Sequence, residues 1–185
     1  MSLNPKYLFK SERLGFRNWL DSDIELMCKI NADEKVMEFF PGIATKAQTA
    51  ELIVKMQQQF KEKGFCYFAV DKLENNEFIG FIGLSEKSFE AEFTPCVDIG
   101  WRISREEWNK GYASEGAQRC LEYAKDVLKL EKIVSIAPKI NVKSEWVMKK
   151  IGMEKVLEFE HPLLINDERL KDCVLYQIML NKTAF

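Results

Sequence analysis

The sequence predicts an α+β fold, in which a mixed central sheet of about six to seven strands has helices on both faces. Three observations predict it. Strand-like and helix-like segments follow one another in the order β-α-α-β-β-β-α-β-α-β-β. Two strand-turn-helix units stand in the second half of the chain, and two further strands follow them. A length of 185 residues with 46% hydrophobic residues is typical of a single domain, expected over residues 1–185.

Helix-capping residues and turn-forming residues set the bounds of the expected elements. Asp21 or Ser22 can begin the first helix, and Thr45 and Gly64 can begin and end the second. A loop is expected at 37–42, where Pro41-Gly42 interrupts an apolar stretch. The predicted strands cover residues 14–19, 66–71, 78–84, 97–103, 132–137, 153–159 and 172–180, and the predicted helices cover 21–31, 45–64, 113–128 and 142–150.

Composition excludes several classes of protein. The net charge of −2 argues against a broad nucleic-acid surface, and no apolar run approaches the length of a membrane span. The segment 1–10 lacks the plan of a signal peptide, so a cytoplasmic location is expected. Five scattered cysteines without a CxxC pair, together with a single histidine, His161, indicate reduced thiols and no metal site.

The turn around Gly111 is a candidate anion site. It lies between a strand at 97–103 and a helix beginning near Ala113, so its backbone N–H groups point out of a helix N-terminus. Gly111 lets a ligand approach the backbone without a Cβ in the way, and Ala113 and Ser114 are small as well. An ordinary helix start is the alternative interpretation of the same residues.

A second strand-turn-helix unit carries Asn141 and Ser144 in its first helical turn. Asn141 can cap that helix, in which case Ser144 is an ordinary first-turn residue. If the strands 97–103 and 132–137 are parallel neighbours, both helices begin at the same end of the sheet, where ligands bind in such sheets. The two units would then line one crevice.

Four motifs in this order resemble the GNAT acetyltransferase superfamily, in its ribosomal-protein-acetylase-like (RimJ/RimL) branch. The motifs are Phe78-Ile79-Gly80-Phe81-Ile82-Gly83-Leu84, Asp98-Ile99-Gly100-Trp101-Arg102, Gly111-Tyr112-Ala113-Ser114-Glu115 and Asn141-x-x-Ser144-x-x-Val147-Met148-x-x-Ile151-Gly152-Met153. The resemblance extends from Ser11-Glu12-Arg13-Leu14 to the last strand. Trp108 stands where the family has Gln or Arg, and Asn109 where this branch often has Gly.

The resemblance implies a GNAT-like fold and acetyl-CoA as cosubstrate, bound between two splayed parallel strands. The strand after Asp98 would pair with the pantetheine arm through its backbone, the turn amides would hold the pyrophosphate, and Asn141 would contact the pantetheine. The implied binding residues are Ile99, Gly100, Trp101, Arg102, Ile103, Trp108, Asn109, Lys110, Gly111, Tyr112, Ala113, Ser114, Asn141 and Ser144.

The implied reaction is direct attack of a neutral amine on the thioester. Asp98 is the candidate general base, acting through a water, and Ser144 the candidate donor to the departing thiolate. A solvated carboxylate and a simple helix cap are the alternatives. Many relatives have a tyrosine four residues before the final glycine, where this chain has Met148, and His161 is expected to be structural.

The acceptor is expected to be a primary amine, either a protein N-terminus or a small molecule. The loops 36–43 and 89–95 are expected to line its site, where Glu38, Glu90 and Glu92 would favour a cation. A solvated acidic surface is the alternative interpretation of these residues. A homodimer is compatible with the sequence, which carries no sign of a nucleic-acid or membrane partner.

Two other functions can be compared with the sequence. A non-catalytic acyl-CoA-binding or sensor module could use the same fold without turnover. A dinucleotide oxidoreductase is disfavoured because the GxGxxG glycines are missing around Gly111.

Overall fold

The computed structural model describes residues 6–180. One mixed sheet of eight strands, in the order β1-β2-β3-β4-β5-β6-β8-β7, forms its centre. Every neighbouring pair of strands is antiparallel except β5 and β6, which run parallel. The first residues of the segment 1–10, in which no leader was expected, lie outside the described range.

The strands and helices follow the predicted order, with one additional strand. The strands are β1 (Phe9–Lys10), β2 (Leu14–Arg17), β3 (Tyr67–Lys72), β4 (Phe78–Lys87), β5 (Cys96–Ile103), β6 (Lys132–Pro138), β7 (Glu154–Glu160) and β8 (Asp172–Met179). The helices are α1 (Asp23–Asn31), α2 (Lys46–Lys63), α3 (Tyr112–Asp126) and α4 (Val142–Lys150), with short 3-10 turns at Arg105–Glu107 and Pro162–Leu164. The prediction of six to seven strands missed β1, which is only two residues long.

Local capping explains where the helices begin and end. Thr45 and Gln48 form a reciprocal capping box at the start of α2, and Gly64 ends it at φ 78°, as the sequence predicted. The predicted cap of α1 is wrong in detail. Ser22 makes no side-chain cap, and the carboxylate of Asp23 instead accepts a hydrogen bond from the backbone N–H of Leu20.

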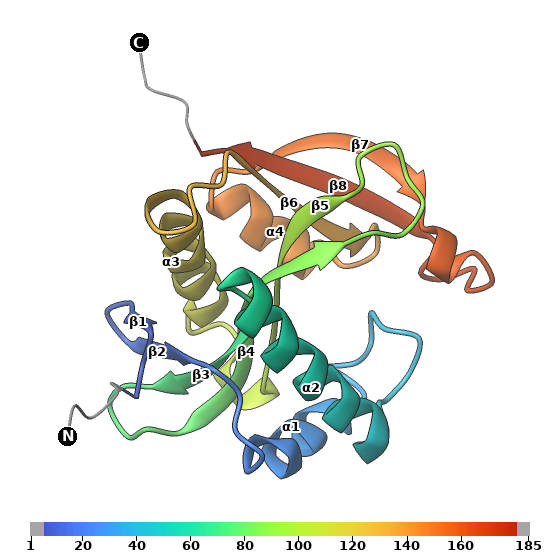
Figure 1. Cartoon of the computed structure of the whole chain (residues 1–185). Coiled ribbons are helices and arrows are strands. Elements are labelled where there is room, and N and C mark those ends of the chain that lie inside the picture. Colours follow the sequence, from blue (N-terminus) through green and yellow to red (C-terminus); the bar gives the residue numbers. More distant parts are fainter. Residues whose placement is uncertain (1–5, 181–185) are drawn as a thin grey trace.

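Helices cover both faces of the sheet, as predicted (Figure 1). Arg102 of β5 bonds to Asn31 of α1, so one face of β5 lies under the α1–α2 pair. Its neighbour Trp101 pairs with Ile82, whose side chain meets Gly116 of α3. Because successive side chains of a strand alternate between faces, α1 and α2 lie on one side of the sheet and α3 on the other.

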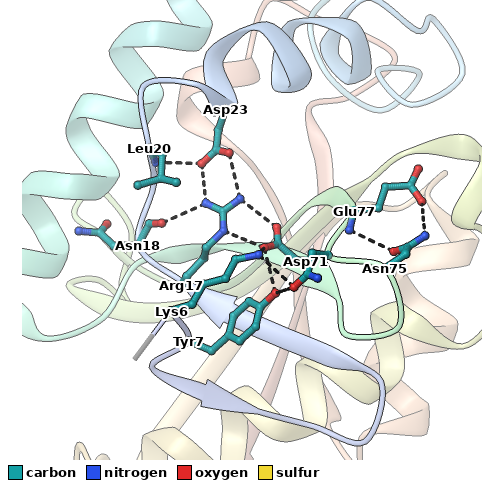
Figure 2. Close-up of polar contacts among 10 residues, drawn as sticks. Lys6, Tyr7, Arg17, Asn18, Leu20, Asp23, Asp71, Asn75 and Glu77 are labelled. Carbon is teal, nitrogen blue, oxygen red and sulfur yellow. Dashed lines mark hydrogen bonds and ion pairs between the residues drawn. The ribbon is translucent and has the colours of Figure 1, made fainter. Parts of the chain in front are cut away.

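A buried ion cluster joins β2, β3 and α1 (Figure 2). The guanidinium of Arg17 forms ion pairs with Asp23 at 2.7 Å and with Asp71 at 2.9 Å, and all three side chains are at least 90% buried. Lys6 and Tyr7 also contact the carboxylate of Asp71, at 3.0 and 3.2 Å. Arg17 is therefore the buried cation that pairs with both carboxylates, whereas Lys6 is half-exposed and pairs with Asp71 alone.

Replacing Arg17 by Leu is expected to lower the free energy of unfolding by about 3–5 kcal/mol, because two carboxylates lose their buried counter-charge. Urea denaturation measures the loss. Lys63→Met is the control, since Lys63 pairs with Glu86 at 3.2 Å on the exposed surface, where such a pair contributes at most about 1 kcal/mol. Equal losses in the two variants would contradict this account of the cluster.

Candidate active site

The parallel strands β5 and β6 separate soon after they meet. They are in register at a single pair, Asp98 with Val134. One residue further on, the hydroxyl of Ser135 donates to the carbonyl of Ile99 at 2.9 Å, in place of a ladder bond. Beyond that point the two strands border a cavity of about 730 Å³, which residues 98–103 all line. The two strands are therefore parallel neighbours, as expected, and the helix after each begins at the same cavity.

The turn before α3 presents a row of unpaired backbone amides. Within the part of the chain that the structure describes, the N–H groups of residues 109–114 donate to no protein acceptor. Asn109 and Gly111 have positive φ, 61° and 84°, which turns successive N–H groups toward one side. The first intrahelical bond runs from Glu115 N–H to Gly111 O, at 3.0 Å. These donors belong to a helix N-terminus, so the turn is suited to an anion.

Residues of the turn between β1 and β2 hold the turn before α3 in place. Glu115 accepts bonds from the Ser11 hydroxyl at 2.6 Å and from the Arg13 backbone at 2.8 Å. The guanidinium of Arg13 contacts the same carboxylate, donates to the Lys110 carbonyl at 3.0 Å and covers the Tyr112 ring. Sequence reasoning gave Ser11 and Arg13 no role, although both stand in a motif that contributed to the family resemblance.

Trp108, at the position where the family pattern has Gln or Arg, has a structural role. Its indole N–H donates to the carbonyl of Ile103 at 3.1 Å, which joins the turn to the end of β5. Lys143 of α4 lies over the same ring, 4.4 Å from its centroid. Lys110 instead pairs with Glu107 and does not line the cavity, unlike the other turn residues 108–114.

Asn141 and Ser144 both line the cavity next to the turn. The side-chain oxygen of Asn141 accepts from the Ser144 backbone at 3.1 Å, so the capping interpretation is confirmed. Capping uses only that oxygen. The amide nitrogen of Asn141 donates to none of the described residues and is available to a ligand.

Asp98 is a buried carboxylate, not the solvated one that was the alternative. It is 5% exposed, and the phenol of Tyr67 on β3 donates to its Oδ2. Lys87 Nζ lies 3.9 Å from the same oxygen. Burial raises the pKa of Asp98 to about 6, against the opposing effects of Lys87, Tyr67 and the Ile136 amide. Such a group is ionised at neutral pH and can still take up a proton.

Sequence reasoning missed Tyr67, which lies on a strand distant in sequence. Gly100 was the available signal, because a Cβ there would lie 3.1 Å from the Tyr67 hydroxyl. A glycine in the middle of β5 thus makes room for an aromatic ring.

The positions of Met148 and His161 are consistent with what the sequence predicted for them. Met148 is buried at the cavity wall, so no tyrosine hydroxyl stands at this position. His161 lies outside the cavity lining, accepts a hydrogen bond from Leu163 N–H at 3.2 Å and contacts the Phe89 ring, as the structural interpretation expects.

The residues that line the cavity differ in one respect from the acceptor site predicted from the sequence. From the loop 36–43, Val36, Phe39 and Phe40 line the cavity as predicted. The loop 89–95 does not line it, nor do Glu38, Glu90 and Glu92. The expected acidic lining is therefore wrong, and the alternative of a solvated acidic surface fits these three exposed side chains.

Comparison with known proteins identifies the family. Residues 13–154 match the acetyltransferase (GNAT) domain. The chain belongs to the GNAT acetyltransferase family. An uncharacterized N-acetyltransferase of Bacillus subtilis, YnaD, is 31% identical over 146 residues, which cover 78% of this chain and 81% of that protein. The GNAT-family acetyltransferase of Bacillus anthracis has 28% identity and a TM-score of 0.77, over 92% of this chain and 97% of its own.

This GNAT chain is therefore an N-acetyltransferase, an enzyme that acetylates amines. A ribosomal-protein-S5-alanine acetyltransferase of Vibrio fischeri shares the fold, with a TM-score of 0.74 at 18% identity over 94% of this chain and 97% of that one. Within residues 6–180, no helix is long and apolar enough to cross a membrane, and no group of three potential metal-binding side chains occurs. The cytoplasmic location stays a prediction.

Proposed function

We propose that this GNAT enzyme belongs to the RimJ/RimL branch and transfers acetyl directly from acetyl-CoA to a primary amine. The observation that carries the proposal is the row of unpaired amides at 109–114, which faces the same cavity as residues 98–103 of β5. A pyrophosphate needs several N–H donors at a helix N-terminus, and a pantetheine arm needs a strand without its neighbour. This cavity offers both.

The cosubstrate would be held mainly by backbone. The amides of residues 109–114 would bind the pyrophosphate, whereas the Trp108 amide, expected to take part, donates to the carbonyl of Arg105 at 3.1 Å. Residues 99–103 would pair with the pantetheine amides as a neighbouring strand does. Asn141 would donate through its free amide nitrogen. Side-chain identity at Trp108 and Asn109 then matters little for binding, which explains how the chain departs from the family pattern there.

Acetyl-CoA supplies the activated acetyl thioester, and Asp98 prepares the acceptor. A lysine or α-amine is largely protonated at neutral pH, so it must lose a proton before it can attack. Asp98 would accept that proton, directly or through a water, and Tyr67 would hold the carboxylate in place. As the C–N bond forms the C–S bond breaks, and the Ser144 hydroxyl would donate a hydrogen bond to the departing thiolate.

Thiol release with acetyl-CoA and an amine panel tests the proposal. The panel contains short peptides, polyamines, aminoglycosides and amino acids, and mass spectrometry of the products identifies the acetylated nitrogen. We expect turnover with at least one class. Binding of acetyl-CoA without turnover on any amine would instead favour an acyl-CoA-binding module, and no binding at all would overturn the placement of the cosubstrate.

A further inference from the structure

The acceptor end of the cavity is cationic. The charged residues that line the cavity are Lys35, Lys87, Arg102 and Lys143, against the carboxylates of Asp98 and Glu107. Glu107 is already paired with Lys72 and Lys110, at 3.0 and 2.9 Å. Lys87 is next to Asp98, and Lys35 is next to Glu38 at 3.9 Å on the surface. Arg102 has no carboxylate within ion-pair distance among the described residues. A polycationic acceptor would meet net repulsion here.

Arg102 is held firmly, yet most of its donors are unused. Its Nη1 donates to Asn31 Oδ1 at 2.7 Å, and Asn31 in turn donates to Thr49 at 2.9 Å. Asn31 and Thr49 are fully buried, so the guanidinium has a fixed position. Its Nε is buried and has no hydrogen-bond partner in the part of the chain described. A guanidinium carries five N–H donors, and here protein acceptors satisfy one.

Aromatic rings fix the orientation of the guanidinium. Its carbon lies 3.9 Å from the centroid of the Phe40 ring and 5.4 Å from that of Phe81. Phe40 is itself held, because Arg169 from the segment before β8 donates to its carbonyl at 3.2 Å. The planar group is therefore preorganised between two rings, with its donors at the wall of the cavity.

The protein partners of this guanidinium are two aromatic rings and one amide oxygen, all of them neutral. Burial lowers the pKa of Arg102 to about 10, so the guanidinium is still charged at neutral pH. An anion bound at this half-buried cation would supply the counter-charge that it lacks among the described residues. Arginine is also the side chain that pairs with a carboxylate through two parallel hydrogen bonds.

Building on the proposed function, we infer that the acceptor is an amine that also carries a carboxylate, and that Arg102 binds this carboxylate. Asp98, Gly100 and Arg102 follow one another on the same face of β5. Asp98 would receive the amine at the point where β5 and β6 begin to separate, and Arg102, further along β5, would hold the other end of the molecule. Phe40, Phe81 and the ring of Tyr67 line the space between and favour an apolar body.

Pairs of compounds that differ only in the carboxylate test the inference on the unaltered enzyme. 4-Aminobutyrate, 6-aminohexanoate and phenylalanine are each compared with the corresponding carboxamide. We expect the best acid to exceed its amide by about 10- to 100-fold in kcat/KM, the range for charge-assisted hydrogen bonds. Titration calorimetry of the same pairs against the protein with CoA present measures acceptor binding without turnover.

Arg102→Met should remove the preference for acid over amide, and Arg102→Lys should keep part of it, because the charge stays and the planar fork is lost. Arg105→Met is the matched control. Arg105 pairs with Asp33 at 3.2 Å outside the cavity, so its loss should leave the ratio unchanged. Acetylation of acids and amides at equal rates, or a preference for spermidine, would overturn the inference and leave the proposed function standing. Failure of every amine would count against the proposed function itself.

Discussion

Asp98→Asn is expected to lower kcat/KM by about 10²–10⁴-fold, the contribution usual for a general base. Asn keeps the size of the side chain and can still accept a hydrogen bond from the Tyr67 phenol, but it cannot take up a proton. Steady-state kinetics with the best acceptor measures the loss. Wild-type turnover in the Asn variant would exclude Asp98 as the base.

The same substitution should stabilise the fold above neutral pH. Burial raises the pKa of Asp98 from 3.8 to about 6, so the protonated form is favoured in the folded state. The stability that depends on this proton is complete below pH 4 and is lost as the pH rises through 6. At pH 8 the ionised carboxylate costs about 3 kcal/mol at most, and Asn avoids that cost. Thermal melts should therefore separate the two proteins at pH 8 and not at pH 4.

The pH profile of kcat adds an independent test. The wild type should show an ascending limb near pH 6, as Asp98 ionises. The pH of this limb should be the same for acceptors whose amines differ in pKa, because the limb reports the ionisation of Asp98 and not of the acceptor. Tyr67→Phe removes a hydrogen bond that lowers the pKa of Asp98, so the limb should move to higher pH. An unmoved limb would show that Tyr67 does not act through Asp98.

How far the sequence predicts this molecule depends on the range of the interactions. Helix limits such as Thr45 and Gly64 are set by neighbours within one turn, and the structure confirms them. The strand-turn-helix units around Gly111 and Asn141 are likewise local. The short β1 was missed because two residues carry no periodic signal, and its pairing with β2 decides that it is a strand.

The parts of the candidate site that local backbone forms could be predicted from the sequence. Contacts between side chains on different strands could be predicted less well. The contact of Tyr67 with Asp98 depends on the register of β3, β4 and β5, which a pattern along one strand does not contain. The charge at the acceptor end of the cavity likewise depends on how distant parts of the chain come together. Glu38, Glu90 and Glu92 are acidic in sequence but lie off the cavity, whereas Arg102 reaches it through β5 and the Asn31 contact.

Gly111→Asp is expected to weaken acetyl-CoA binding by roughly 100-fold, and Gly111→Asn far less. A Cβ at this position would lie 3.5 Å from Arg13 Nη2, an ordinary contact, so the protein itself has room for either side chain, and both would add the same bulk beside a bound ligand. Both substitutions take the left-handed φ of 84° at similar cost, because Asn and Asp adopt it more readily than most residues.

The two variants therefore differ in charge alone, and the charge stands among the amides of residues 109–114, where the pyrophosphate is proposed to bind. Two like charges a few ångströms apart near a protein surface repel by about 4 kcal/mol before salt screens them. Titration calorimetry at low and high salt measures both affinities, and the gap between Asp and Asn should narrow as salt rises. Equal affinities at low salt would show that the pyrophosphate binds elsewhere, even if the Asp98 predictions succeed, because the base and the amide row are separate parts of one cavity.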